Sequence, residues 1–152
     1  MAKKNTGKAA PKRARDMLQP NLTVDAIVID GQGRLLLVER GRDPYKGSFA
    51  LPGGFVEYGE TVEDAAAREL KEETGLRATA IELVGVYSDP NRDPRGHTVT
   101  IVFHLRVEGG ELKAGDDAAK ARFFPVDQLP PLAFDHGRIV SEFLAKSKVR
   151  ED

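Results

Sequence analysis

The sequence contains no cysteine, so disulfide bonds and thiol chemistry are excluded. Long apolar runs are also missing: segments such as residues 35–38 are far too short to cross a bilayer, and no apolar stretch follows the basic N-terminal residues. No charge of one sign dominates, because the formal net charge is −1. We therefore expect a cytoplasmic protein with no membrane partner and no nucleic-acid partner, and a homodimer stays open.

What the chain does contain suits one domain with one core, since 40% of its 152 residues are apolar. Residues 1–20 differ from the rest, because they carry six basic residues and one acidic residue without apolar periodicity. We expect a solvated, disordered tail there, with an arm for acidic surfaces as the alternative. A folded domain is expected over residues 21–148.

Apolar patterning and turn signals predict several strands in this body. They are expected at residues 23–30, 35–40, 48–51, 80–88, 98–107 and 122–126. The turn Gly31–Arg34 predicts a hairpin between the first two strands, and Pro52–Gly54 is expected to end the third.

Two helices are expected between these strands. The first covers Val62–Thr74, with Thr61 as its N-cap and Gly75 as the residue after its end. The second begins after Asp135, where an apolar stripe recurs at helical spacing. This order of elements predicts an α/β protein, an α/β/α sandwich with a mixed sheet.

Three glutamates of the first helix, Glu69, Glu72 and Glu73, have the spacing i, i+3 and i+4, which places them on one face. Such like charges destabilise an isolated helix by about a few tenths of a kcal/mol per pair, so a positive partner is expected. Clustered carboxylate oxygens suit Mg²⁺ or Mn²⁺. The alternative is a solvated acidic face paired with Arg68 or Lys71.

The longer segment Gly54–Leu76 carries a pattern in which nine positions are specified, Gly-x5-Glu-x7-Arg-Glu-apolar-x-Glu-Glu-x-Gly-apolar. The matching residues are Gly54, Glu60, Arg68, Glu69, Leu70, Glu72, Glu73, Gly75 and Leu76. Chance would produce this match on the order of once in 10⁹ placements. The pattern is that of the Nudix box, so the chain resembles the Nudix hydrolases.

This resemblance implies a Nudix α/β/α sandwich over about residues 21–145, with a catalytic loop–helix–loop. It implies that the three glutamates, with the backbone carbonyl of Gly53 or Gly54, bind the metal, which is Mg²⁺ with Mn²⁺ as the alternative. It also implies that Arg68 braces these glutamates, and that Glu60 positions this network or binds metal through water.

The segment Ser88–His97 has two prolines and a glycine, so it is expected to be a loop that carries binding residues. Arg92 and Arg95 are candidates for binding phosphates there. In the Nudix family, a proline at the place of Pro90 is associated with ADP-ribose pyrophosphatases. The resemblance thus favours a small nucleotide substrate, ADP-ribose, hydrolysed to AMP and ribose 5-phosphate.

Two functional alternatives stay open. One is hydrolysis of a nucleoside triphosphate or dinucleoside polyphosphate, and the other is a non-catalytic domain that senses ADP-ribose.

Phe49 and Phe134 are candidates for stacking on a base, although core packing is favoured for each ring taken alone.

The general base is expected in the segment 115–118, where Asp116 and Asp117 are adjacent. Neighbouring carboxylates raise one another's pKa toward what a base needs at neutral pH. Asp117 is preferred because it lies nearer the following strand. Glu69 or Glu60 is the alternative within the box.

Overall fold

The computed structural model describes residues 18–113 and 120–151, so most of the predicted tail lies outside the described residues. One sheet has the strand order β4 (Gly53–Phe55), β1 (Asn21–Ile27), β6 (Thr98–Gly110) and β5 (Leu76–Tyr87). The other has the order β3 (Phe49–Ala50), β2 (Arg34–Glu39) and β7 (Ala121–Pro125). Strand β1 runs antiparallel to β4 and parallel to β6, which confirms a mixed sheet.

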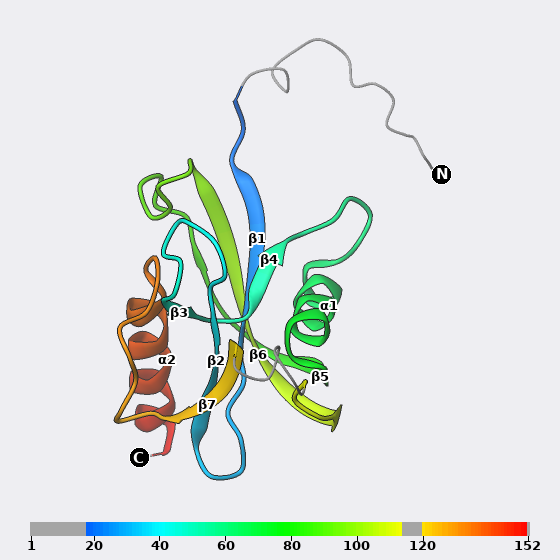
Figure 1. Cartoon of the computed structure of the whole chain (residues 1–152), viewed down its shortest axis with the longest axis vertical. Helices are drawn as coiled ribbons and strands as arrows, with labels where there is room; N and C mark the ends of the chain where they lie inside the picture. The colour runs from blue at the N-terminus through cyan, green and yellow to red at the C-terminus, as the bar shows by residue number, and fades with distance from the viewer. Residues whose placement is uncertain (1–17, 114–119, 152) are drawn as a thin grey trace.

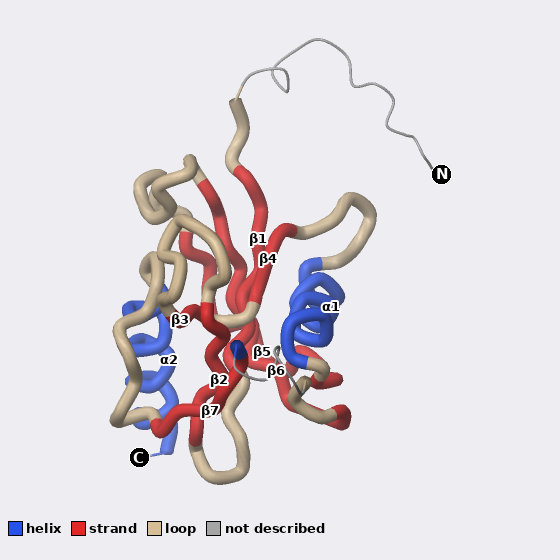
Figure 2. Tube along the Cα trace, viewed as in Figure 1, coloured by secondary structure: helices blue, strands red, loops and turns tan. Residues whose placement is uncertain are grey.

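Two helices, α1 (Val62–Thr74) and α2 (His136–Glu151), lie on opposite sides of these strands (Figures 1 and 2). Alternate residues of β1 serve the two sides: Val24 and Ala26 share a buried cluster with Leu70 of α1, whereas Ile27 shares one with Ile139 of α2. Each fully buried side chain of this kind contributes about 1.5–3 kcal/mol. The α/β/α sandwich is therefore confirmed.

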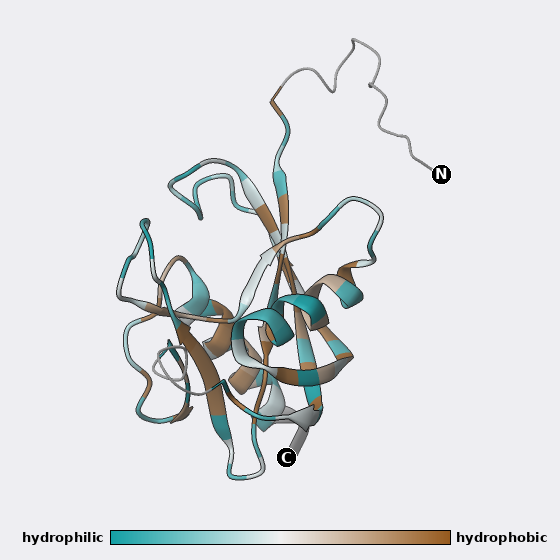
Figure 3. Cartoon of the chain, turned by 45° about the vertical axis from the view of Figure 1, so that its right-hand side comes forward, coloured by the Kyte–Doolittle hydropathy of each residue, from teal (hydrophilic) through white to brown (hydrophobic). Residues whose placement is uncertain are grey.

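Helix α1 has the bounds that its sequence predicts. The Thr61 hydroxyl accepts a hydrogen bond from the Asp64 N–H at 3.1 Å, and Gly75 ends the helix in a left-handed conformation with φ of 85°. The Gly75 N–H then donates to the Lys71 carbonyl. Hydrophilic residues follow the outward side of α1, while its apolar residues face the strands (Figure 3).

Two expectations about the strands hold only in part. The Gly31–Arg34 turn forms, and an antiparallel bridge between Ile29 and Leu35 makes a short hairpin beside it. Beyond this bridge the two strands belong to different sheets. The third strand, β3, ends at Ala50 before Pro52 as expected, but Gly53 and Gly54 of the expected turn pair with β1 as part of β4. In both cases pairing with strands distant in sequence limits how far the local arrangement extends.

The remaining elements differ from expectation mainly at their ends. Strand β5 begins at Leu76, four residues early, because Leu76 is buried in the cluster under α1. Strand β6 continues to Gly110 as the partner of that early segment. Within residues 18–113 and 120–151, no helix combines the length and the apolar character needed to cross a membrane.

Candidate active site

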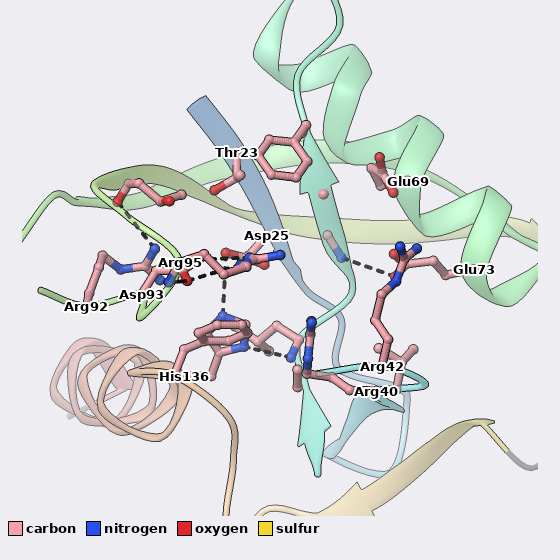
Figure 4. A pocket seen from close by; sticks show the side chains of 18 of the residues that line it. Thr23, Asp25, Arg40, Arg42, Glu69, Glu73, Arg92, Asp93, Arg95 and His136 are labelled. Carbon is pink, nitrogen blue, oxygen red and sulfur yellow. Dashed lines mark hydrogen bonds and ion pairs between the residues drawn. The ribbon is translucent and has the colours of Figure 1, made fainter. Parts of the chain in front are cut away.

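A cavity of about 570 Å³ opens where the two sheets and both helices approach one another. Figure 4 shows Glu69 and Glu73 projecting from α1 on one side, with Arg92 and Arg95 of the β5–β6 loop on the other. The floor lies between these sides and carries polar residues of β1 and of the start of α2. The cavity therefore has an acidic wall and, opposite it, a basic wall.

The acidic wall depends on close contact between α1 and β4. The Gly53 N–H donates to Oε1 of Glu73 at 3.1 Å, and the Glu69 carboxylate lies against Gly54. A Cβ atom on Gly54 would lie 2.4 Å from Oε2 of Glu69, so a side chain at this position would displace the Glu69 carboxylate. Burial, together with the nearby charge of Glu69, raises the pKa of Glu73 to about 8.

Arg68 has the contacts expected of a brace. Its guanidinium contacts Glu60 at 2.6 Å, Glu69 at 3.1 Å and Glu72 at 3.3 Å, and it also donates to the Phe55 carbonyl. The hydrogen bond from Arg68 holds the pKa of Glu60 below its usual value. The Glu72 side chain is 58% exposed. Among the box-helix glutamates of the described residues, Glu69 and Glu73 line the cavity.

The two arginines expected to bind phosphates are not equivalent. Arg92 is 5% exposed and donates to both oxygens of Asp135, at 2.6 and 2.9 Å. Its hydrogen-bonding capacity is therefore largely used within the protein. Arg95 pairs with Asp93 at 2.8 Å but stays 45% exposed and lines the cavity. Arg95 is the more accessible of the two for a substrate.

Two further arginines, Arg40 and Arg42, line the cavity and were not predicted. The Arg40 Nε donates to the Pro44 carbonyl at 2.6 Å, and its guanidinium lies 4.9 Å from the centre of the Phe134 ring. Burial lowers the pKa of Arg40. Their position just after the end of β2 is the signal that sequence analysis could have used, because loops after strands often carry binding residues.

The aromatic candidates occupy different surroundings. Phe134 lines the cavity, with the Arg40 and Arg95 guanidiniums 4.9 and 5.5 Å from its ring centre. Its backbone has a φ of 53°, which is strained for a residue other than glycine. Phe49 instead packs on Phe124 at 5.0 Å in the apolar cluster beside α2.

Two other predicted residues are not part of the cavity. Pro90 is exposed in the β5–β6 loop, and it is absent from the described residues that line the cavity. Asp117, the expected general base, and its neighbour Asp116 lie outside the described residues. The roles given to these residues stay predictions.

Sequence analysis also missed a buried polar group in the cavity floor. The Thr100 hydroxyl donates to Oδ2 of Asp25 at 2.6 Å, and Nε2 of His136 lies 3.7 Å from the same oxygen. Burial raises the pKa of Asp25 to about 7, although the Thr100 hydrogen bond lowers it. The signal in the sequence was an aspartate between the apolar residues Val24 and Ala26. A buried carboxylate is costly unless it is paired, so an aspartate in such a strand predicts a specific polar partner.

Comparison with known proteins agrees with this geometry. The family model described as NUDIX domain matches residues 19–143. An ADP-ribose pyrophosphatase of Methanocaldococcus jannaschii is 54% identical over 143 residues, covering 94% of this chain and 84% of that protein.

Two solved structures share the fold. The NUDIX domain of Shewanella oneidensis NrtR, complexed with ADP ribose, has a TM-score of 0.75 at 27% identity, covering 90% of this chain and 93% of that one. An ADP-ribose pyrophosphatase of Streptococcus suis has a TM-score of 0.69 at 28% identity, covering 85% and 92%.

The chain therefore belongs to the NUDIX family. It is a hydrolase of the Nudix type, and hydrolases of this family use divalent metal ions. In the described part of the chain, no three acidic, histidine or cysteine side chains already surround one point as a complete metal site.

Proposed function

We propose that this protein hydrolyses the diphosphate bond of ADP-ribose, giving AMP and ribose 5-phosphate. The observation that carries the proposal is the cavity, in which Glu69 and Glu73 face a space also lined by Arg40, Arg42 and Arg95. Carboxylates that hold divalent cations and guanidiniums that bind phosphate are the two kinds of group that a diphosphate substrate requires. The 54% identical relative named ADP-ribose pyrophosphatase supports this choice of substrate.

The box glutamates have the chemistry of a divalent-cation site. Glu73 is buried beside Glu69, and its pKa of about 8 means that two negative charges are unfavourable there without a cation. We assign Glu69, Glu72 and Glu73 as carboxylate ligands and the Gly53 carbonyl as a further ligand. Hard oxygen donors favour Mg²⁺, with Mn²⁺ as the alternative.

Each part of the cavity then has a separate task. A bound divalent cation lowers the pKa of water and neutralises phosphate charge. Arg95, from the wall opposite the glutamates, and Arg40, from the loop after β2, orient the diphosphate. Phe134, whose ring lies beside both guanidiniums, contributes an aromatic surface toward the base or ribose. Water attacks one phosphorus, and the bond from that phosphorus to the bridging oxygen breaks.

We assign Asp117 as the general base that accepts the proton of the attacking water, with Glu60 and Glu69 as alternatives. Glu60 is the weaker alternative, because two hydrogen bonds from Arg68, at 2.6 and 3.0 Å, hold its pKa low. A pH–rate profile of Asp117→Asn, beside Asp116→Asn and Glu60→Gln, tests this assignment. If Asp117→Asn keeps the wild-type kcat and acidic limb, the base lies within the box.

The test of the function is a panel of ADP-ribose, nucleoside triphosphates, oxidised triphosphates and dinucleoside polyphosphates, assayed with Mg²⁺ and with Mn²⁺. We expect the highest kcat/KM for ADP-ribose, with AMP and ribose 5-phosphate as products. A kcat/KM at least about tenfold higher for any triphosphate would contradict the assigned substrate. Tight binding of ADP-ribose without turnover would instead identify a sensor.

A further inference from the structure

His136, the first residue of α2, lies in the cavity floor between β1 and the segment that joins β3 to β4 (Figure 4). Its side chain is 5% exposed, and its Nδ1 accepts a hydrogen bond from the Leu51 N–H at 3.0 Å. A nitrogen that accepts carries no proton, so the neutral ring has its proton on Nε2. Burial lowers the pKa of His136 to about 4, which agrees with a neutral ring.

The second ring nitrogen has a weaker contact. Nε2 of His136 lies 3.7 Å from Oδ2 of Asp25, which is longer than a hydrogen bond. That oxygen already accepts the Thr100 hydroxyl at 2.6 Å. The Leu51 N–H is therefore the one direct hydrogen-bond partner among the described contacts of the His136 ring.

Leu51 leads directly into the glycine segment that contacts the acidic wall. Two residues later the Gly53 N–H donates to Oε1 of Glu73 at 3.1 Å. At the next position, the missing side chain of Gly54 leaves the space that the Glu69 carboxylate occupies. A shift of Leu51 would therefore move the backbone against which both carboxylates are placed.

We propose that His136 is a positioning residue: through its hydrogen bond with the Leu51 N–H, it holds Gly53 and Gly54 in the place that prepares Glu73 and Glu69 for a divalent cation. This inference rests on the proposed metal-binding roles of these two glutamates. Groups that orient metal ligands without touching the metal commonly change metal affinity or activity by about 10–100-fold when they are replaced.

Three substitutions separate the roles of the two ring nitrogens of His136. His136→Asn keeps an acceptor where Nδ1 stands, His136→Gln moves its polar end toward the place of Nε2, and His136→Ala removes both. We expect His136→Gln and His136→Ala to raise the Kd for Mn²⁺, measured without substrate, by about tenfold or more. Both should lower kcat by a similar factor with little change in KM, whereas His136→Asn should stay within about threefold of the wild type.

His104→Gln is the matched control. The His104 ring also packs against α2, at 5.1 Å from the Phe143 ring, and its Nδ1 lies 3.7 Å from Glu82. It does not line the cavity of the described structure. Loss of its packing should lower the melting temperature while leaving the Mn²⁺ Kd and kcat unchanged, which separates positioning from general stability.

Either of two results would overturn the inference. One is a wild-type Mn²⁺ Kd and kcat in His136→Gln, and the other is an ¹⁵N NMR spectrum of the wild type in which Nδ1 of His136 carries the proton. The NMR measurement needs no substitution, so it decides the matter even if the variants fail to fold. Glu73→Gln distinguishes the two proposals: if it keeps metal binding and turnover, the assignment of Glu73 as a metal ligand fails, whatever the His136 variants show.

Discussion

Arg92 donates to both carboxylate oxygens of Asp135, so the β5–β6 loop is tied to the residue that precedes α2. The Arg92 side chain is 5% exposed, and that of Asp135 is 19% exposed. Because the pair is largely removed from water, the loss of one partner leaves an uncompensated charge. Among the arginines of the cavity, Arg92 therefore serves mainly the architecture of the protein.

Asp135→Asn should accordingly lower the free energy of unfolding by about 3 kcal/mol. The KM for ADP-ribose should change by less than about threefold, since Arg95 rather than Arg92 has the accessible guanidinium. Denaturant unfolding and steady-state kinetics on the same variant measure both quantities. A large rise in KM without loss of stability would show that Arg92 binds substrate after all.

Glu72→Gln and Glu73→Gln should each lower kcat by at least about 10²-fold, with a smaller effect on KM, because the lost charge acts mainly on the transition state. The fold should survive, since neither change removes apolar contact. Glu63→Gln is the control, because Glu63 lies exposed in the first turn of the same helix. A near-wild-type kcat in both variants at saturating Mg²⁺ would remove the assignment of these ligands.

Arg68→Lys should lower kcat by about 10- to 100-fold, because an ammonium cannot contact Glu60, Glu69 and Glu72 at once. Arg138→Lys provides the comparison. Arg138 also pairs with a glutamate four residues on, at 2.9 Å from Glu142, but on the exposed face of α2. Equal kinetic effects from the two substitutions would argue against a bracing role for Arg68.

The stability of the metal-free protein should depend on Glu73. The folded-state pKa of Glu73, about 8, lies above its usual value of 4.5, so folding favours the protonated form. The stabilising contribution is fully present below pH 4.5 and is lost as the pH rises through 8, by on the order of 5 kcal/mol.

Asp25 has a raised pKa as well, so the wild type must be compared with Glu73→Gln. In chelator, the free energy of unfolding of the wild type should fall relative to that of the variant between pH 5 and pH 8. Added Mg²⁺ should reduce this difference by favouring the ionised carboxylate. Parallel pH profiles of the two proteins in chelator would contradict the raised pKa.

The sequence predicts those features whose causes are local. The bounds of α1 follow from the Thr61 hydroxyl at one end and from Gly75 at the other, and both act within four residues. The shared face of Glu69 and Glu73 follows from helical spacing alone. The box pattern adds the family, because it specifies nine positions within one short segment.

The features that were missed depend on contacts between distant residues. Asp25 meets Thr100 because β1 pairs with β6, and it meets His136 because α2 packs beneath both. No turn or helix signal in the local sequence predicts which distant strands pair. The same reason explains why the predicted hairpin is short: Ile29 and Leu35 form the bridge beside the turn, and beyond it each strand pairs with strands distant in sequence.

The contact between Gly54 and Glu69 also separates the glycines of this chain into two kinds. Gly33 has a φ of 78° with no heavy atom within 4 Å of an added Cβ, so asparagine, which tolerates this conformation, should replace it at small cost. Gly54 has an ordinary φ, but the Cβ of an alanine there would displace the Glu69 carboxylate, which we assign to the metal site. A saturation library scored for turnover should therefore accept asparagine at position 33, whereas substitutions at position 54 should lower turnover more than they lower stability.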